Sequence, residues 1–173
     1  MGLNKNVVEL ELNYEKWKEL YLEVEKELKE ILNEIIIDIQ HVGSTAIPML
    51  KAKPIVDVAV AVENLDSVLK YEKLLEERGY SLRNDGGIKG EYLIRKGPEE
   101  NRTHYIHVVK LNSKRWLELI NFRDILLNNP DIKEEYQKLK EELKKQFPED
   151  RKNYTRGKSD YIKKVFHKFD IHF

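Results

Sequence analysis

The chain has no cysteine among its 173 residues. Disulfide bonds, zinc sites with thiolate ligands and a cysteine nucleophile are therefore excluded, because each of them needs a thiol. The absence of cysteine agrees with a reducing compartment, where disulfides are rare. The length predicts a single domain, large enough to bury a good core without covalent cross-links.

An excess of charge of one sign is also lacking, since Lys+Arg and Asp+Glu both number 31. This balance argues against nucleic acid as a partner, because proteins that bind nucleic acids usually carry a basic excess. The longest apolar runs, such as IVDVAVAV at 55–62, are too short to span a bilayer. The N-terminal segment has no apolar core of a signal peptide. We therefore expect a cytoplasmic protein without a membrane partner, and the sequence gives no indication of its oligomeric state.

Two glycine-rich nucleotide-binding motifs are missing, G-x-G-x-x-G and G-x-x-x-x-G-K-[ST]. Apolar periodicity and capping residues predict helices at 14–32, 65–78, 113–128, 131–146 and 158–168, with Asn13 and Asp66 as N-caps. β-Branched runs predict strands at 35–42, 55–62, 91–96 and 103–110, the last two as a hairpin, and residues 80–90 are predicted as a mobile turn region. Because the order lacks regular βαβ alternation, it favours an α+β fold over a doubly wound sheet.

The turn Gly43-Ser44-Thr45 follows the first predicted strand. Glycine lets a ligand approach the backbone closely, and successive N–H groups in such a turn can face an anion, with the two hydroxyls as further donors. The simpler alternative is a strand-to-helix turn in which Ser44 is the N-cap. The turn by itself is weak evidence for a phosphate site.

Asp57 interrupts the apolar strand at 55–62, where a carboxylate is costly unless it is paired or binds a cation. Strand alternation places Asp57, Ala59 and Ala61 on one face and the intervening valines on the other. The valine face is predicted to be core, whereas the small residues beside Asp57 leave space for a ligand. The alternative is a structural ion pair between Asp57 and a neighbouring Arg, Lys or His.

Together the Gly-Ser turn and the carboxylate strand resemble the nucleotidyltransferase superfamily, in which such a turn holds nucleotide phosphates and the carboxylate holds Mg²⁺. The chain resembles the GrpB family more closely, through motifs spread over almost its whole length: HVGSTAIP at 41–48, KPIVD at 53–57, RTHYIHV at 102–108, FRD at 122–124, and Tyr154 with Lys158. The resemblance implies a nucleotidyltransferase-like mixed β-sheet flanked by helices. Its single domain would cover 1–173, with a core of about 1–112 and a helical tail of about 113–173.

The resemblance also implies a function and a cofactor. The expected ligand is a nucleotide or another small phosphorylated molecule, and the expected reaction is transfer of a nucleotidyl group to an unknown acceptor. Asp57 and His107 would be the catalytic residues and the ligands of a divalent metal, Mg²⁺ or Mn²⁺, with Zn²⁺ not excluded. The phosphate would contact the turn and nearby cations: Gly43, Ser44, Thr45, Lys53, Arg95, Arg102 and Lys158.

Two departures weaken the catalytic interpretation. Catalytic members of the superfamily usually have a second carboxylate two residues after the first, where this chain has Ala59. The strand expected to carry a third carboxylate offers His104 and His107, which fall on opposite faces because their spacing is odd. One Asp with imidazoles is a poor match for two Mg²⁺ ions, which prefer oxygen ligands.

Two alternatives therefore stay open beside the transferase. One is a ligand-binding or interaction protein that keeps the fold without the reaction, and the other is a phosphoester hydrolase that uses His107 with Asp57. His107 could also be an ordinary half-buried histidine with a satisfied hydrogen bond. The transferase interpretation requires Ser44, Asp57 and His107 to meet in one open cleft.

Overall fold

The computed structural model describes residues 7–83 and 88–172, and its core is one mixed sheet of five strands. The strands are β1 (Asp38–Val42), β2 (Val56–Val62), β3 (Tyr80–Arg83), β4 (Glu91–Lys96) and β5 (His104–Lys110). They lie in the order β1-β2-β5-β4-β3. The central pair β2 and β5 is parallel, while every other neighbouring pair is antiparallel. The predicted α+β class is confirmed, and so is the β4–β5 hairpin.

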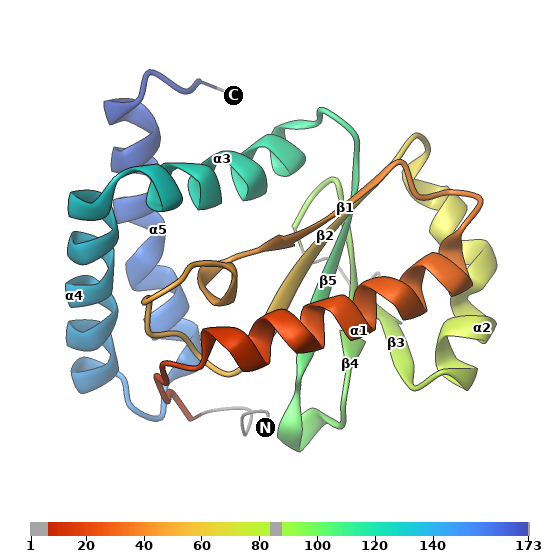
Figure 1. The fold of residues 1–173 in the computed structure, drawn as a ribbon, viewed down its shortest axis with the longest axis horizontal. Coiled ribbons are helices and arrows are strands. Elements are labelled where there is room, and N and C mark those ends of the chain that lie inside the picture. The colour runs from red at the N-terminus through yellow and green to blue at the C-terminus, as the bar shows by residue number, and fades with distance from the viewer. Residues whose placement is uncertain (1–6, 84–87, 173) are drawn as a thin grey trace.

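Helices lie on both faces of this sheet (Figure 1). They are α1 (Tyr14–Leu32), α2 (Glu72–Glu77), α3 (Lys114–Asn128), α4 (Pro130–Gln146) and α5 (Arg151–Lys168), with short 3₁₀ helices η1 (Ser44–Ala46), η2 (Leu65–Tyr71) and η3 (Glu99–Asn101). Among the described residues, none of these helices is long and apolar enough to cross a membrane.

The two faces of β2 bury different side chains, as the alternation predicts. The four valines at 56, 58, 60 and 62 are fully buried in the main core, which α1 and α2 cover. On the other face, Ala59 and Ala61 pack with Trp116 of α3. Helices α3, α4 and α5 share a second apolar cluster beside the sheet. Asp57 therefore lies at the place where the sheet meets this helical layer.

Several predicted boundaries are wrong, and local hydrogen bonds explain them. The first strand begins at Asp38 and not at 35, because the backbone N–H of Ile35 and of Ile36 donates to the carbonyl of Leu32 in a turn after α1. Residues 65–71 form a 3₁₀ helix whose N-cap is Asn64, not Asp66, since the Asn64 side chain accepts from the Asp66 N–H. The remainder, α2, is a short α-helix.

The predicted turn region at 80–90 is also partly wrong, because residues 80–83 form β3 on the edge of the sheet. The residues Asp85, Gly86 and Gly87 of that prediction lie outside the described residues. Helix α1 begins at the predicted place, but the Asn13 side chain makes no capping hydrogen bond.

The last helix starts seven residues before the predicted start at 158, at Arg151. Its N-cap is Asp150, whose side chain accepts from the backbone N–H of Asn153 at 3.0 Å. Because the helix begins earlier, Lys158 lies two turns inside it and not at its start. Arg151, Tyr154 and Lys158, spaced by three and four residues, therefore share one face of α5.

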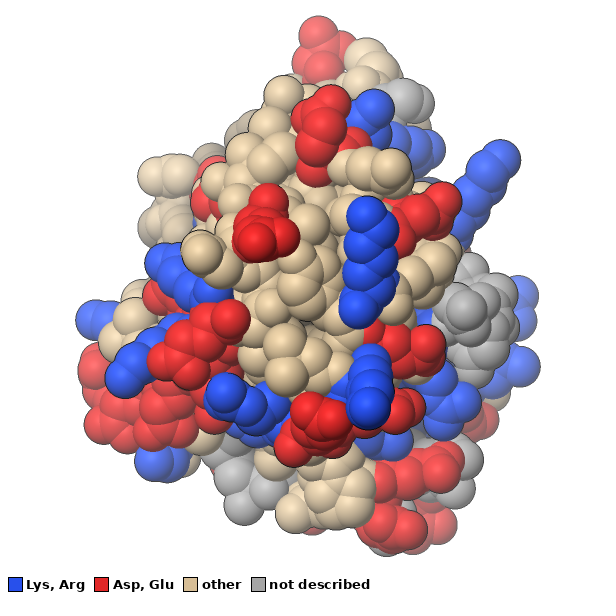
Figure 2. Space-filling model, turned by 90° about the vertical axis from the view of Figure 1, so that its right-hand side faces the viewer, with Lys and Arg blue, Asp and Glu red and all other residues tan. Residues whose placement is uncertain are grey.

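Charged side chains of both signs cover the surface. In Figure 2 the Lys and Arg residues lie next to Asp and Glu, without a broad area of one sign on the face shown. This mixture agrees with the balanced composition of the chain.

Candidate functional site

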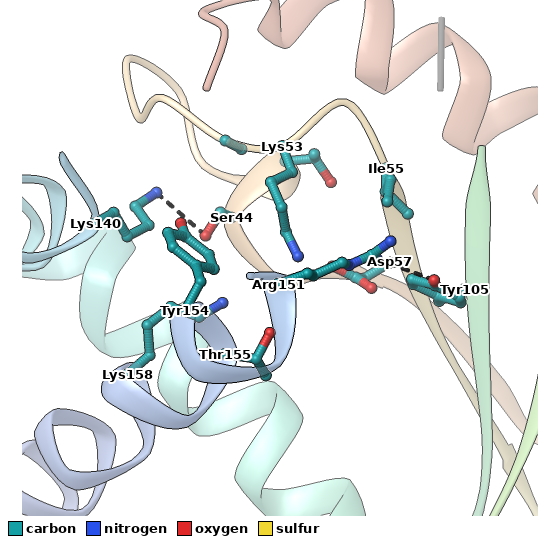
Figure 3. Close-up of a pocket in the computed structure, with 12 residues that line it drawn as sticks. Ser44, Lys53, Ile55, Asp57, Tyr105, Lys140, Arg151, Tyr154, Thr155 and Lys158 are labelled. Carbon is teal, nitrogen blue, oxygen red and sulfur yellow. Dashed lines mark hydrogen bonds between the residues drawn. The ribbon is translucent and has the colours of Figure 1, made fainter. Parts of the chain in front are cut away.

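A cavity of about 270 Å³ lies between the η1 turn, the start of β2 and the helices α4 and α5. Figure 3 shows side chains from these elements pointing into the same space. The lining residues are Ser44, Thr45, Ala52, Lys53, Ile55, Asp57, Tyr105, Lys140, Arg151, Tyr154, Thr155 and Lys158. We call this space the cationic cavity, because four of these residues are Lys or Arg.

The Gly43 turn brings the backbone directly against Asp57. Gly43 has φ +70°, and a Cβ atom at this position would lie 2.6 Å from Oδ2 of Asp57. Only glycine allows this approach without strain, since both the backbone angle and the space exclude a side chain. Ser44 is the first residue of η1 and Gly43 is its N-cap, so the alternative in which Ser44 is the N-cap is wrong.

Four cations face the single carboxylate among the described residues that line the cavity. Burial, together with repulsion from Lys158 and Arg151, holds the pKa of Lys53 well below its usual range. Burial and repulsion from Lys158 lower the pKa of Lys140 to about 7. Burial also lowers the pKa of Lys158 to about 8, although Asp57 opposes this shift. The cavity therefore gathers four basic groups around one carboxylate, and burial and repulsion disfavour protonation of its three lysines unless an anion is present.

Tyrosine rings position these cations. The ammonium nitrogens of Lys53 and Lys158 lie 5.4 Å and 4.8 Å from the centre of the Tyr154 ring. Arg151 lies over the Tyr105 ring and donates a hydrogen bond to its hydroxyl at 3.0 Å. Such contacts attract a cation without neutralising it, so the charges stay available to an anion.

Lys140 reaches the turn from α4. Its Nζ donates a hydrogen bond to the carbonyl of Lys51 and another, at 3.4 Å, to the Ser44 hydroxyl. The side chain is almost completely buried, with 1% of the residue exposed. Lys140 therefore holds Ser44 at the edge of the cavity and places a positive charge behind it.

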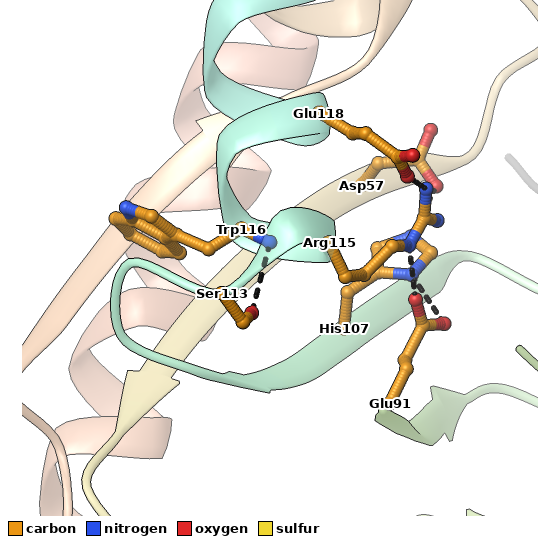
Figure 4. Close-up of polar contacts among 7 residues, drawn as sticks. All are labelled: Asp57, Glu91, His107, Ser113, Arg115, Trp116 and Glu118. Carbon is orange, nitrogen blue, oxygen red and sulfur yellow. Dashed lines mark hydrogen bonds and ion pairs between the residues drawn. The ribbon is translucent and has the colours of Figure 1, made fainter. Parts of the chain in front are cut away.

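His107 on β5 lies between two carboxylates (Figure 4). Its Nδ1 is 2.8 Å from Oε1 of Glu91, and its Nε2 is 3.5 Å from Oδ1 of Asp57. Burial favours the neutral ring, but hydrogen bonds to Asp57 and Glu91 outweigh it and raise the pKa of His107 to about 9. Arg115 contacts the other oxygen of Glu91 at 2.6 Å. The two carboxylates therefore favour the protonated, imidazolium form of His107.

Asp57 is not sealed by this ion pair, because 32% of its side chain is exposed. A second cavity, of about 400 Å³, adjoins the first, and Ser44, Asp57 and Lys158 line both. His107 lines only the second. The arrangement that the transferase interpretation requires is thus present: Ser44, Asp57 and His107 border one continuous cleft.

The remaining predicted residues fall into two groups. Lys53 and Thr45 line the cationic cavity, although the Thr45 hydroxyl already pairs with Nε2 of His41 at 3.0 Å. Arg95 and Arg102 are absent from the described walls of both cavities. The Arg102 guanidinium donates instead to the carbonyl of Gly97 at the end of the β4–β5 hairpin. Arg102 is therefore not brought to the cleft, and Arg95, although it lies opposite Tyr105 in the β4–β5 pair, is outside both described walls.

Sequence reasoning missed Lys140 and Arg151. Lys140 follows Tyr136 by four residues and continues the buried stripe of α4, which also contains Ile132 and Leu143. A lysine inside an apolar stripe is the signal that could have found it. Arg151 was missed because the predicted start of α5 was too late, and Asp150 was the overlooked N-cap.

The donor set does not fit the predicted divalent metal. Within the described residues, no group of three or more Asp, Glu or His side chains could hold an ion. His107 is already engaged by Glu91 and Asp57. Mg²⁺ and Mn²⁺ prefer oxygen ligands, and Asp57 is the single carboxylate among the described residues that line the cationic cavity. The four basic groups around it oppose the approach of a divalent cation.

Comparison with known proteins agrees with these motifs. The model of the GrpB protein family matches residues 7–168. The chain belongs to the GrpB family. A crystal structure of the conserved protein GrpB from Enterococcus faecalis is similar with a TM-score of 0.81 and 35% identity, over 88% of this chain and 91% of that one. The predicted family is therefore confirmed.

Curated relatives show how the chain compares in length. Glutamate-rich protein GrpB of Alkalihalophilus pseudofirmus is 40% identical over 79% of this chain and 81% of its own length. YqkA of Bacillus subtilis is 35% identical over 92% of this chain, which spans only 46% of YqkA. A more remote similarity to the poly(U) polymerase Cid1, with a TM-score of 0.45 and 12% identity, carries no argument about activity.

Proposed function

We propose that this protein binds a small phosphorylated ligand, such as a nucleotide, in the cationic cavity. The supporting observation is the convergence of Lys53, Lys140, Arg151 and Lys158 on a space with one carboxylate. Buried charges are normally paired, so an excess of this kind is costly unless an anion compensates it. A phosphate group carries the required charge and several strong acceptor oxygens.

The shifted lysines give this proposal a thermodynamic basis. Burial, with added repulsion from Lys158 at Lys140 and from Arg151 at Lys158, lowers the pKa values of Lys140 to about 7 and of Lys158 to about 8. A bound phosphate stabilises the protonated amines, so binding near pH 8 is accompanied by proton uptake. The Ser44 hydroxyl, at the edge of the same cavity, adds a neutral donor for a phosphate oxygen.

The same observations favour binding over metal-dependent nucleotidyl transfer. Ala59 is fully buried where a second carboxylate would be needed, and the Glu91 carboxylate contacts both His107 and Arg115. Asp57 and His107 stay the proposed catalytic pair for a reaction without metal, since an imidazolium can donate a proton to a leaving oxygen. Release of pyrophosphate from nucleoside triphosphates, abolished by Asp57→Asn, would instead support transfer.

Isothermal titration of the full chain with ribose 5-phosphate, and with ribose as the uncharged control, tests the binding proposal. We expect saturable binding of the phosphate only. A ligand at about 100 Kd should stabilise the fold by about 2.7 kcal/mol. Arg151→Met should weaken binding about tenfold or more, because it removes a charge-assisted contact of about 1.5–3 kcal/mol.

Arg102→Met is the matched control, because Arg102 donates to Gly97 and does not line the cavity. This variant should bind ribose 5-phosphate like the unmodified chain. The proposal fails if ribose 5-phosphate does not bind, or if both arginine variants lose the same affinity.

A further inference from the structure

The second cavity differs from the cationic cavity in the chemistry of its walls. It is larger, about 400 Å³, and its outer wall comes from α3 and α5. The apolar residues of that wall are Leu119, Phe122, Ile162 and Phe166. Because Ser44, Asp57 and Lys158 line both spaces, a ligand can occupy the two cavities at once.

The apolar wall is held rigidly by aromatic packing. The ring of Phe122 meets Tyr136 edge-on with a centroid distance of 5.1 Å and Phe166 with one of 6.0 Å. These residues belong to the apolar cluster that joins α3, α4 and α5. The wall is therefore formed before any ligand binds, and a flat apolar group can enter without the cost of ordering it.

Polar side chains line the same cavity beside the apolar ones. They are His107 of β5 and Arg115 and Glu118 of α3, with Oε2 of Glu118 3.4 Å from Arg115. A saturated alkyl group can form no hydrogen bond with these side chains. A heteroaromatic ring presents an apolar face together with an edge of donors and acceptors, so it matches both kinds of lining residue.

We infer that the phosphorylated ligand is a nucleoside 5′-phosphate whose base occupies the second cavity, against Leu119 and Phe122, while its phosphate lies in the cationic cavity. This inference rests on the proposed function and extends it from phosphate to the base. The two cavities meet at Ser44, Asp57 and Lys158, so the ribose would pass between them at this junction.

The test compares four compounds by isothermal titration against the full chain: AMP, CMP, ribose 5-phosphate and hexyl phosphate. All four have a phosphate monoester, and only the first two have a base. A base can stack on the Phe122 ring and cover the neighbouring apolar side chains, which neither the sugar nor the alkyl chain can do. At least one nucleotide should therefore bind about tenfold or more tightly than ribose 5-phosphate and hexyl phosphate.

Two variants in the wall locate the base. Leu119→Ala and Ile162→Ala should each weaken nucleotide binding severalfold and leave ribose 5-phosphate binding unchanged. Leu127→Ala is the matched control, because Leu127 lies on the same helix as Leu119 but is 45% exposed and outside the second cavity. Thermal unfolding identifies a variant that fails to fold. If one wall variant fails, the nucleotide affinity of the other wall variant tests the base site.

The outcomes separate this inference from the proposed function. Equal affinity for ribose 5-phosphate and both nucleotides overturns the base site and leaves the phosphate site standing. Tighter binding of hexyl phosphate than of either nucleotide also overturns it, since the cavity would then accept an alkyl group. If none of the four compounds binds, the proposed function fails and the base site fails with it.

Discussion

The ammonium nitrogen of Lys140 lies 3.4 Å from the hydroxyl oxygen of Ser44, although 96 residues separate them in the chain. Lys140 belongs to α4 and Ser44 to the turn after β1, so this contact ties the helical layer to the sheet. Lys140 and Ser44, together with residues of α5, form the wall of the cationic cavity around Asp57. The basic groups that favour phosphate binding therefore destabilise the folded chain when no ligand is bound.

Replacing Lys140 should show this destabilisation in the free energy of unfolding. Burial lowers the pKa of Lys140 from its usual 10.5 to about 7. The unfolded chain therefore binds more protons than the folded chain between about 7 and 10.5, and this group raises the free energy of unfolding as pH increases through that window. The slope is at most about 1.4 kcal/mol per pH unit.

Urea unfolding of the wild-type chain and of Lys140→Met between pH 7 and 9.5 tests this expectation. The difference in unfolding free energy, wild type minus variant, should increase with pH. Lys145→Met, an exposed position on the same helix, is the control and should show no such slope. A constant difference for Lys140→Met would mean that the amine keeps its ordinary pKa.

His107 should show the opposite pH dependence. Its pKa in the folded chain is raised from 6.5 to about 9, because hydrogen bonds to Asp57 and Glu91 outweigh its burial. The stability it contributes is fully present below about pH 6.5 and is lost as pH rises through about 9. The windows of His107 and Lys140 overlap, so single variants, and not the pH profile of the whole chain, separate the two groups.

Glu91→Gln should lower the pKa of His107 towards its usual value, because it removes the charge 2.8 Å from Nδ1. The measurement is an NMR titration of the His107 ring between pH 5 and 10. Glu118→Gln is the matched control, since Glu118 contacts Arg115 but no hydrogen bond joins it to His107 in the described structure. An unchanged midpoint in Glu91→Gln would show that Glu91 does not set the protonation of His107.

Gly43 can be tested against another glycine of positive φ. Gly43 and Gly79 have φ +70° and +80°, but a Cβ would meet Asp57 at 2.6 Å only at Gly43. Both alanine variants place a side chain on a backbone of positive φ, which costs roughly 1–3 kcal/mol. Gly43→Ala should destabilise the chain more than Gly79→Ala in urea unfolding, because it also displaces the Asp57 carboxylate.

Both alanine variants can also be measured in an Asp57→Ala background, to test why Gly43→Ala destabilises the chain more than Gly79→Ala. Removing the carboxylate relieves the closest contact, so the cost of Gly43→Ala should decrease there, while that of Gly79→Ala should stay the same. Equal costs of Gly43→Ala in both backgrounds would mean that the turn, and not its approach to Asp57, requires glycine.

The sequence predicted the parts of this fold that depend on local pattern. The alternation in 55–62 correctly separated the buried valines from Asp57, and the odd spacing of His104 and His107 correctly placed them on opposite faces. Helix boundaries were less predictable where one side chain decided them, as Asp150 does for α5. Local patterns are set by backbone geometry, whereas a cap depends on a single hydrogen bond.

The cationic cavity was only half predictable for a different reason. Gly43, Ser44 and Asp57 lie close together in sequence and carry the family motif, so they could be found. Lys140 and Arg151 approach from the helical tail, and only the packing of α4 and α5 brings them to the turn. Arg95 and Arg102 have the right chemistry, but neither lines the two described cavities: Arg102 donates to Gly97, and Arg95 lies opposite Tyr105 without reaching the walls.

The charge of Asp57 distinguishes an anion site from a metal site. If the cations alone hold the phosphate, Asp57 repels the ligand, so Asp57→Asn should bind ribose 5-phosphate severalfold more tightly at pH 6. This pH lies below the pKa values of Lys140 and Lys158, about 7 and about 8, so both amines are charged. Mg²⁺ should not change the affinity of either protein, because the four basic groups around Asp57 oppose the approach of a divalent cation. The measurement is isothermal titration in EDTA and in Mg²⁺. Tighter binding with Mg²⁺ in the wild-type chain, lost in Asp57→Asn, would instead identify Asp57 as the ligand of a metal that bridges to the phosphate.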